Sequence, residues 1–169
     1  MKSTTRADRF LYMLPRIVVV AVFMLFVVFT ALSNFDIIEP YFYPLHLVQG
    51  KVRDVAPTII MGPYPRGDQI RALKRQGTTV DISLLNLSLP QELALHEQLK
   101  KYGAKEGIEV LNFPLSYLNL ESAENKEMVS KVVSYIRQNS GKKIYIHCYL
   151  GRHRVKVVED ELRRQGLIP

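Results

Sequence analysis

The hydrophobic and polar positions divide the chain into two unlike parts. From Ile17 to Leu32 every residue is uncharged and almost all are apolar, whereas the chain from Pro57 onward alternates short apolar runs with amphipathic stretches. A continuous apolar run favours a membrane-spanning helix, and alternating strand-like and helix-like patterns favour an α/β domain. The sequence therefore predicts one helix in a bilayer, followed by one globular domain.

The alternation in the second part predicts its elements. Four short apolar runs predict strands, at 58–61, 79–85, 109–113 and 142–147. Four amphipathic stretches predict helices: from Asp68, which would cap the helix, to Gly77; from Pro90 to Tyr102, ended by Gly103; over 122–138; and over 155–165. Strands that alternate with helices predict an α/β fold with a mainly parallel central sheet flanked by helices. In such folds ligands bind at the carboxyl ends of the strands.

The apolar run leaves three interpretations open. Its sixteen residues are fewer than the ~20 that usually cross a bilayer, but its flanks can extend it to a span over 17–35. A cleaved signal peptide is the main alternative, because Ala31-Leu32-Ser33 offers small residues for cleavage. A buried core helix is disfavoured, because no polar residue marks an outward face.

Flanking charge predicts how such a span is oriented. Lys2, Arg6, Arg9 and Arg16 precede the run, and the next basic residue after it is Lys51. The positive-inside rule therefore predicts a cytoplasmic N-terminus at 1–16. After the span, the sequence predicts a juxtamembrane linker at 36–56 and a globular domain at 57–169. That domain would lie on the periplasmic or extracytoplasmic side of the inner or plasma membrane.

The net charge of +7 favours anionic substrates or an anionic membrane surface as partners. Nucleic acid is not indicated, because the basic residues are dispersed and no aromatic residues are interleaved with them. The single cysteine, Cys148, excludes an intramolecular disulfide framework and a cysteine-based metal site.

The candidate chemistry lies in the run His147-Cys148-Tyr149-Leu150-Gly151-Arg152-His153-Arg154, between a predicted strand and a predicted helix. The backbone N–H groups of such a loop and the positive end of the helix can bind a phosphate. The same groups favour a Cys148 thiolate near neutral pH, and the Arg154 guanidinium can hold two phosphate oxygens. The alternative is a buried structural cysteine before a solvated basic helix.

The Cys148-x5-Arg154 spacing, preceded by His147, resembles the signature of cysteine-dependent phosphatases of the dual-specificity branch of the protein tyrosine phosphatase superfamily. The segment Ile59–Ile82 resembles the opening strand, first helix and second strand of small bacterial members. The resemblance implies that Cys148 is the nucleophile, that Arg154 binds the phosphate, and that no metal or other cofactor is needed. The phosphate-binding residues it implies are Tyr149, Leu150, Gly151, Arg152, His153 and Arg154.

Two positions depart from the family pattern. The family's general acid is an aspartate in the loop after the strand at 109–113, but Pro114–Leu120 contains no carboxylate. Glu121 is the nearest candidate, although a carboxylate there also suits the start of the next helix. Without an acid, leaving groups of low pKa or an acid from elsewhere would be required. Val155 replaces the usual Ser or Thr, which predicts slow breakdown of a phosphocysteine.

Several hypotheses follow. The first is a membrane-anchored phosphatase acting on a phosphorylated protein or on lipid or inositol headgroups. The second is a pseudophosphatase that serves as an accessory subunit of a larger membrane complex, and a rhodanese-like or arsenate-reducing enzyme is a weaker third. His147 either orients the loop or is a core histidine, and Arg152 and His153 either add positive charge to the site or point into solvent.

Overall fold

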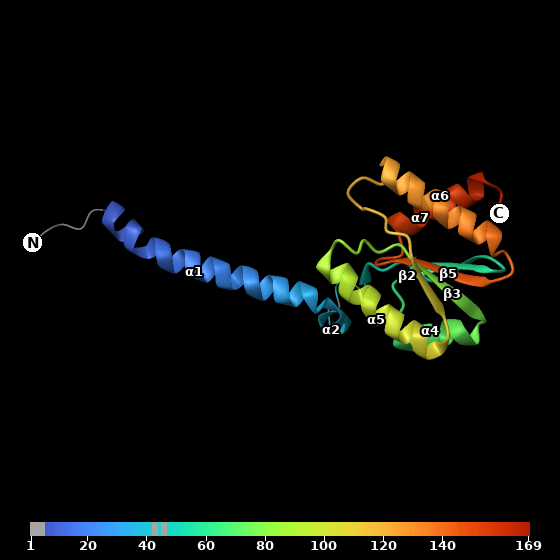
Figure 1. The fold of residues 1–169 in the computed structure, drawn as a ribbon, viewed down its shortest axis with the longest axis horizontal. Coiled ribbons are helices and arrows are strands. Elements are labelled where there is room, and N and C mark those ends of the chain that lie inside the picture. The colour runs from blue at the N-terminus through green and yellow to red at the C-terminus, as the bar shows by residue number, and fades with distance from the viewer. Residues whose placement is uncertain (1–5, 42–43, 45–46) are drawn as a thin grey trace, which may run out of the picture.

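A computed structural model describes residues 6–41, 44 and 47–169, with side chains from residue 13 onward (Figure 1). Helix α1 (Arg6–Ser33) projects as a single rod from an α/β domain. Its segment Met13–Ser33 is long and apolar enough to cross a membrane by length and composition, and none of it is buried. The helix is thus longer than the sixteen-residue apolar run suggested, and its exposure argues against a core helix of the domain.

The described strands form one five-stranded sheet in the order β1-β2-β5-β3-β4. Strands β2, β5, β3 and β4 pair in parallel, whereas β1 pairs antiparallel with β2. The bounds are Arg53–Ala56 for β1, Ile59–Pro63 for β2, Thr78–Ser83 for β3, Glu109–Asn112 for β4 and Lys143–Cys148 for β5.

The sheet is therefore mixed, and the prediction of a mainly parallel sheet is corrected. Pro57 and Thr58 join β1 directly to β2, and a two-residue connection can only place two strands antiparallel. Strand β1 lies within the stretch 36–56 that the sequence suggested as a linker. As a short edge strand with exposed Arg53 and Asp54, it carries no apolar run that would have revealed it.

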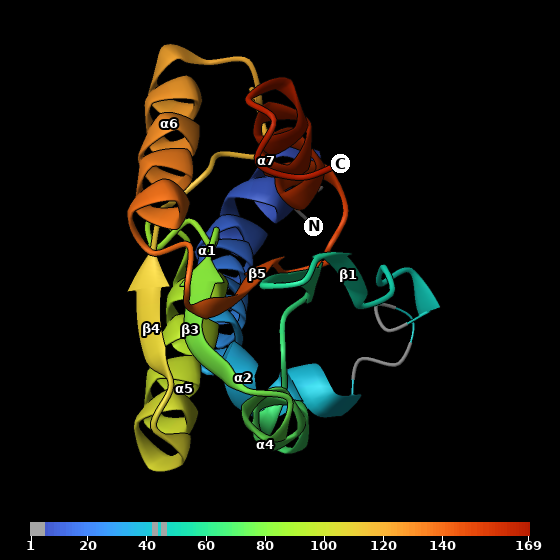
Figure 2. The same cartoon turned by 90° about the vertical axis from the view of Figure 1, so that its right-hand side faces the viewer.

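Helices cover both faces of the sheet (Figure 2). Helices α6 (Ala123–Gln138) and α7 (His153–Arg164) lie on one face, and α4 (Gly67–Arg75) and α5 (Pro90–Glu106) lie on the other. The α6 and α7 face buries the larger apolar cluster, including Val132, Val133, Val155, Val158 and Leu162 against Ile82 and Ile146. The regular spacing that predicted the helix at 122–138 is confirmed, and Ser122 caps it by accepting a hydrogen bond from the Asn125 N–H.

Two predicted helix boundaries are wrong. Asp68 does not cap α4, because the cap is Arg66 and Asp68 lies in the first turn. Gly103 does not end α5, which continues to Glu106 and is capped by Gly107, a residue with φ of +66°. Gly103 instead allows the helix to approach β4, since a Cβ there would lie 2.5 Å from a methyl group of Val110.

Candidate active site

Cys148 lies where the sequence predicted it, at the carboxyl end of a strand in the middle of the sheet. It is the last residue of β5, where it pairs with Pro63 of β2, and the preceding residue His147 pairs with Ser83 of β3. The next residues form a tight loop, and α7 begins at His153. We call residues 148–154 the phosphate loop. The topology thus places the sulfur at the edge of the sheet where α/β proteins bind ligands.

Neighbouring segments fix the orientation of the loop's peptide groups. The Tyr64 N–H donates to the Tyr149 carbonyl at 3.2 Å, and the Gly50 N–H donates to the Leu150 carbonyl at 2.7 Å. A trans peptide points its C=O and N–H in opposite directions, so the N–H groups of Leu150 and Gly151 face away from these donors. Within the described part of the chain, neither N–H donates to a backbone carbonyl in any hydrogen bond outside those internal to the helices and strands. Such a row of N–H groups ahead of a helix forms an anion-binding nest.

Gly151 has the left-handed backbone that this loop requires. Its φ is +66°, and a Cβ on it would lie 2.3 Å from the backbone nitrogen of Pro63. No other residue type fits a turn that combines this torsion with so close an approach to β2. The path of the phosphate loop past β2 therefore depends on a glycine at position 151.

The Cys148 side chain faces the α6 and α7 side of the sheet and is only 3% exposed. It belongs to the larger apolar cluster, in which Leu84, Leu115 and Val155 are also buried. The position is thus shielded, and the Arg154 guanidinium is close enough to Cys148 to interact with it. A buried cysteine alone would suit either a structural or a nucleophilic role, so the neighbouring charge matters.

Arg154 is buried and held by one carboxylate. Glu92, in the first turn of α5, accepts from both terminal nitrogens, at 2.8 Å from Nη1 and 2.6 Å from Nη2. The carbonyls of Leu84 and Leu115 accept from Nη1 at 3.0 and 3.2 Å. Burial by itself would lower the pKa of Arg154, but the hydrogen bonds and charge of Glu92, together with the nearby Cys148, outweigh it and raise that pKa above its ordinary value.

Glu92 is the site residue that the sequence analysis missed. Its Oε2 also accepts from the Asn86 N–H, so the carboxylate ties the loop before α5 to the guanidinium. A glutamate two residues after a helix-starting proline is common on solvated surfaces, where the helix dipole favours it. Its separation from Arg154 by 62 residues leaves no local signal for the pairing.

His147 points away from the sulfur, into the α4 and α5 face. Its Nε2 lies 3.0 Å from Oδ1 of Asp81, although the two groups are not aligned as a hydrogen bond, and its ring stacks on Tyr145. Both His147 and Asp81 are almost fully buried. Its backbone carbonyl accepts from the Leu84 N–H at 2.8 Å. The side chain therefore has the surroundings of a core histidine, and only its backbone touches the segment that contacts Arg154.

The neighbouring His96 of α5 predicts a pH-dependent stability. Burial lowers its pKa, which outweighs the opposing charge of Glu97, and its Nδ1 has no hydrogen-bond partner. Below about pH 6.5 the unfolded chain binds a proton at His96 that the folded chain does not, so stability falls as pH falls. We expect His96→Leu to flatten this loss in urea unfolding of the detergent-solubilised chain between pH 7.5 and 5.5. An unchanged slope would show that His96 is not held neutral.

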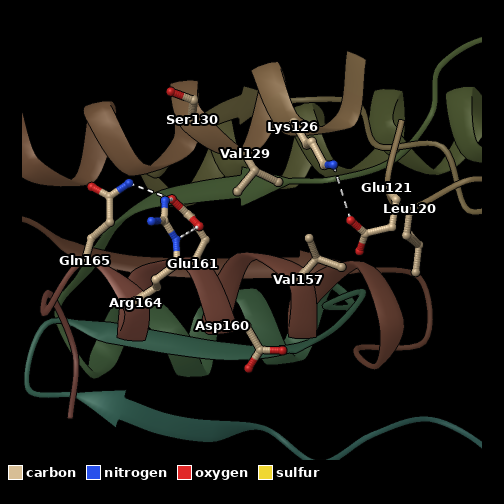
Figure 3. Close-up of a pocket in the computed structure, with 10 residues that line it drawn as sticks. All are labelled: Leu120, Glu121, Lys126, Val129, Ser130, Val157, Asp160, Glu161, Arg164 and Gln165. Atoms are coloured by element: carbon tan, nitrogen blue, oxygen red, sulfur yellow. Dashed lines mark hydrogen bonds and ion pairs between the residues drawn. The ribbon is translucent and has the colours of Figure 1, made fainter. Parts of the chain in front are cut away.

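Glu121 is not brought to the phosphate loop. Its side chain is 82% exposed and lies 3.5 Å from the Lys126 ammonium. It lines a groove between α6 and α7, together with Val157, Glu161 and Arg164, as Figure 3 shows. The segment before it is held by Asn125, whose side chain bonds both backbone groups of Ser116. The structure therefore places Glu121, the candidate general acid, in an ion pair on the surface rather than beside Cys148.

Arg152 and His153 are exposed at the outer side of the phosphate loop. Together with Lys51, Arg53 and Lys156, and with the apolar side chains of Leu120 and Val157, they line an open groove of about 490 Å³ that reaches Gly151. Glu159 pairs with Arg53 and Asp160 pairs with Lys156, whereas the described residues provide no ion pair for Lys51 or Arg152. We call this the basic groove. Within the described part of the chain no cluster of three His, Cys, Asp or Glu side chains could hold a metal ion.

Comparison with solved structures identifies the architecture. A DUF442 protein of Shewanella putrefaciens CN-32, assigned as a phosphatase, superposes with a TM-score of 0.58 at 22% identity over 70% of this chain and 74% of its own. The chain therefore shares its fold with solved phosphatase structures. The core catalytic domain of the PP-IP phosphatase Siw14 from S. cerevisiae gives a TM-score of 0.54 at 19% identity, covering 70% of this chain and 68% of its own. TpbA of P. aeruginosa gives 0.50 at 16% identity, with 70% of each chain covered.

These likenesses lie below 25% identity and establish the fold rather than the activity. No protein-family model matches the chain, and no curated protein matches it. The activity must therefore be argued from the phosphate loop and the residues around it.

Proposed function

We propose that this chain is a membrane-anchored, cysteine-dependent phosphatase that hydrolyses phosphate esters through a phosphocysteine. The observation that carries the proposal is the geometry of the phosphate loop. Cys148 precedes a turn whose carbonyls, at Tyr149 and Leu150, accept hydrogen bonds from neighbouring segments, and the buried, charged Arg154 follows that turn. The exposed apolar helix α1 supports the anchor, and the basic flank before it supports a domain on the extracytoplasmic side. Phosphorylated proteins or lipids are the substrates that this arrangement admits.

The first chemical step transfers the phosphoryl group to sulfur. The Cys148 thiolate attacks phosphorus, the S–P bond forms, and the bond from phosphorus to the ester oxygen breaks. The N–H groups of Leu150 and Gly151 and the remaining donors of Arg154 stabilise the charge on the equatorial oxygens. Glu92 and the Leu84 and Leu115 carbonyls occupy the other side of the guanidinium, which holds its plane in place before substrate binds.

The second step is hydrolysis of the S–P bond. Water attacks phosphorus, inorganic phosphate leaves, and the Cys148 thiolate is regenerated. Val155 is fully buried and offers no hydroxyl to assist departure of the thiolate, so this step is expected to limit turnover. A phosphocysteine should therefore accumulate during steady-state turnover.

The second candidate function is a pseudophosphatase that binds partners in a membrane complex. It is favoured by the position of Glu121, which pairs with Lys126 on the surface and leaves the loop after β4 without a carboxylate near Cys148. A pseudophosphatase would keep an anion-binding loop without turnover, and it would be recovered with partner proteins after mild detergent extraction.

Cys148→Ser separates the two candidates. We expect it to reduce the hydrolysis of para-nitrophenyl phosphate by about 10³-fold or more, because the nucleophile is removed. Acid quenching of the wild-type chain during turnover should trap phosphate covalently, and the variant should trap none. Ser134→Ala on the exposed side of α6 is the matched control and should retain activity. Wild-type protein with no turnover, or equal turnover by Cys148→Ser, would overturn the phosphatase.

A further inference from the structure

Three exposed apolar side chains of the domain, Leu93, Tyr117 and Leu118, lie at the edge that carries the phosphate loop. Outside α1, the exposed large apolar residues of the described chain are Ile37, Tyr41, Leu47, Val48, Val52, Leu93, Tyr117 and Leu118. Leu93 lies in the first turns of α5, which follows β3, and Tyr117 and Leu118 lie in the loop that follows β4. Because β3, β4 and β5 are parallel, these positions share the edge that carries the phosphate loop.

The C-terminal end of α1 meets this same edge of the domain. Ser33, Asn34 and Asp36 line a shallow pocket together with Pro90 and Leu93 at the start of α5. Figure 1 shows α1 leaving the domain on the side where α5 begins and where the loop between β4 and α6 protrudes. With α1 in a bilayer, the apolar edge would therefore lie at the level of the headgroups, where Tyr and Leu side chains are favoured.

The segment after α1 packs directly on the phosphate loop. This contact fixes the distance between the phosphate loop and the membrane. The Phe35 ring in helix α2 (Phe35–Ile38) contacts the Tyr149 ring edge-on, with centroids 6.0 Å apart. Glu39 begins the short helix η1 (Glu39–Tyr41), is buried, and pairs with Arg66 at 3.3 Å. Burial and the Glu39 carboxylate raise the pKa of Tyr149 above its ordinary value, so this phenol remains neutral. A loop held so close to the anchor favours a substrate that is itself in the bilayer.

The lack of a carboxylate near Cys148 in the loop after β4 restricts which leaving groups the site can release. The segment Pro114–Leu120 carries no carboxylate, and Glu121 pairs with Lys126 on the surface, so an alkoxide leaving group would lack a proton donor from this loop. A phosphate leaving group needs none, because its own second pKa is near 6. The basic groove continues from Gly151 and offers Lys51 and Arg152 to a second phosphate.

We propose that the physiological substrate is a lipid-linked diphosphate in the bilayer surface, an inference that rests on the phosphatase proposed above. Cys148 attacks the terminal phosphorus, and the anhydride P–O bond breaks, so that the lipid leaves as its monophosphate without needing a proton. Water then cleaves the S–P bond and releases inorganic phosphate. Tyr117 and Leu118 contact the headgroup region beside α1, while Lys51 and Arg152 hold the inner phosphate.

The test uses the full chain reconstituted in phosphatidylcholine vesicles. Three substrates are compared by their kcat/KM: geranylgeranyl diphosphate in the vesicles, geranylgeranyl monophosphate in the vesicles, and water-soluble isopentenyl diphosphate. We expect the kcat/KM of geranylgeranyl diphosphate to exceed each of the other two by about tenfold or more. Equal or faster turnover of the monophosphate, of the soluble diphosphate or of a phosphotyrosyl peptide would overturn the inference. Para-nitrophenyl phosphate turnover would still support the phosphatase in those cases, and its absence would remove both proposals.

Variants at the edge test the membrane contact separately. Leu118, which is 83% exposed, is replaced in Leu118→Asp, and we expect the ratio of vesicle diphosphate turnover to para-nitrophenyl phosphate turnover to fall about tenfold. Ser134→Asp on α6 is the control and should leave this ratio unchanged. The chain contains no tryptophan, so Leu118→Trp also provides a single fluorophore. Brominated lipids should quench it and should not quench Ser134→Trp; equal quenching, or none, would overturn the membrane contact.

Discussion

Glu92→Ala is expected to remove most of the activity and ~3–5 kcal/mol of stability, because it leaves the Arg154 guanidinium buried without its carboxylate. The two carbonyls that remain, from Leu84 and Leu115, bond only Nη1 and allow the guanidinium to turn. A displacement of about 1 Å in a phosphate-binding group can lower kcat/KM by ~10²-fold. Para-nitrophenyl phosphate kinetics and urea unfolding of the detergent-solubilised chain measure the two effects.

Two further substitutions show whether the effect of Glu92→Ala depends on the pairing. Glu97→Ala lies on the same helix but breaks only an exposed pair with Lys100, so it should cost less than about 1 kcal/mol and leave activity intact. Glu92→Gln keeps one carbonyl oxygen and turns an amide donor toward a guanidinium nitrogen, so it should be as inactive as the alanine variant while retaining volume. Full activity in Glu92→Gln would show that the carboxylate does not position Arg154.

Most elements predicted from local signals agree with the structure, apart from the helix boundaries predicted at Asp68 and Gly103. The apolar steps in 122–138 mark one face of α6, and those at Val155, Val158 and Leu162 mark the buried face of α7. The loop at Cys148 was also predictable, because glycine, the β-branched strand before it and the helix after it are consecutive in the chain. Periodicity and turn chemistry act over a few residues, and a single sequence reports them directly.

The remaining features depend on contacts between distant residues, and no local pattern could have revealed them. Strand β1 exists because Arg53 and Asp54 pair with Met61 and Ile60 across a hairpin, not because its residues are apolar. Glu92 and Arg154 meet only once the sheet orders β3 and β5 side by side. Glu39 lies in the predicted juxtamembrane linker at 36–56, yet it is buried in η1 and pairs with Arg66. Each is a polar residue whose partner the fold selects, and tertiary context of this kind overrides local propensity.

Gly151→Ala is expected to collapse the phosphate loop, with a loss of at least ~10²-fold in kcat/KM and of about 3 kcal/mol or more in stability. The left-handed torsion at Gly151 disfavours any Cβ, and the Cβ would also overlap the Pro63 backbone. Relief requires the loop to move away from β2, which breaks the bonds that Tyr64 and Gly50 donate to Tyr149 and Leu150. The N–H groups that bind the phosphate would then lose their common direction, even though Cys148 and Arg154 are unchanged.

Gly141→Ala is the matched control, since no atom lies within 4 Å of a Cβ there and its φ is not positive. It should be neutral or slightly stabilising, because alanine reduces the conformational freedom of the unfolded chain. Comparing the two variants by urea unfolding and by para-nitrophenyl phosphate turnover separates the loss of a glycine from the loss of this loop conformation. An active, stable Gly151→Ala would mean that the carbonyls of Tyr149 and Leu150 are not tied outward as described. The N–H nest would then not account for anion binding, and the case for a phosphatase would rest on Cys148 and Arg154 alone.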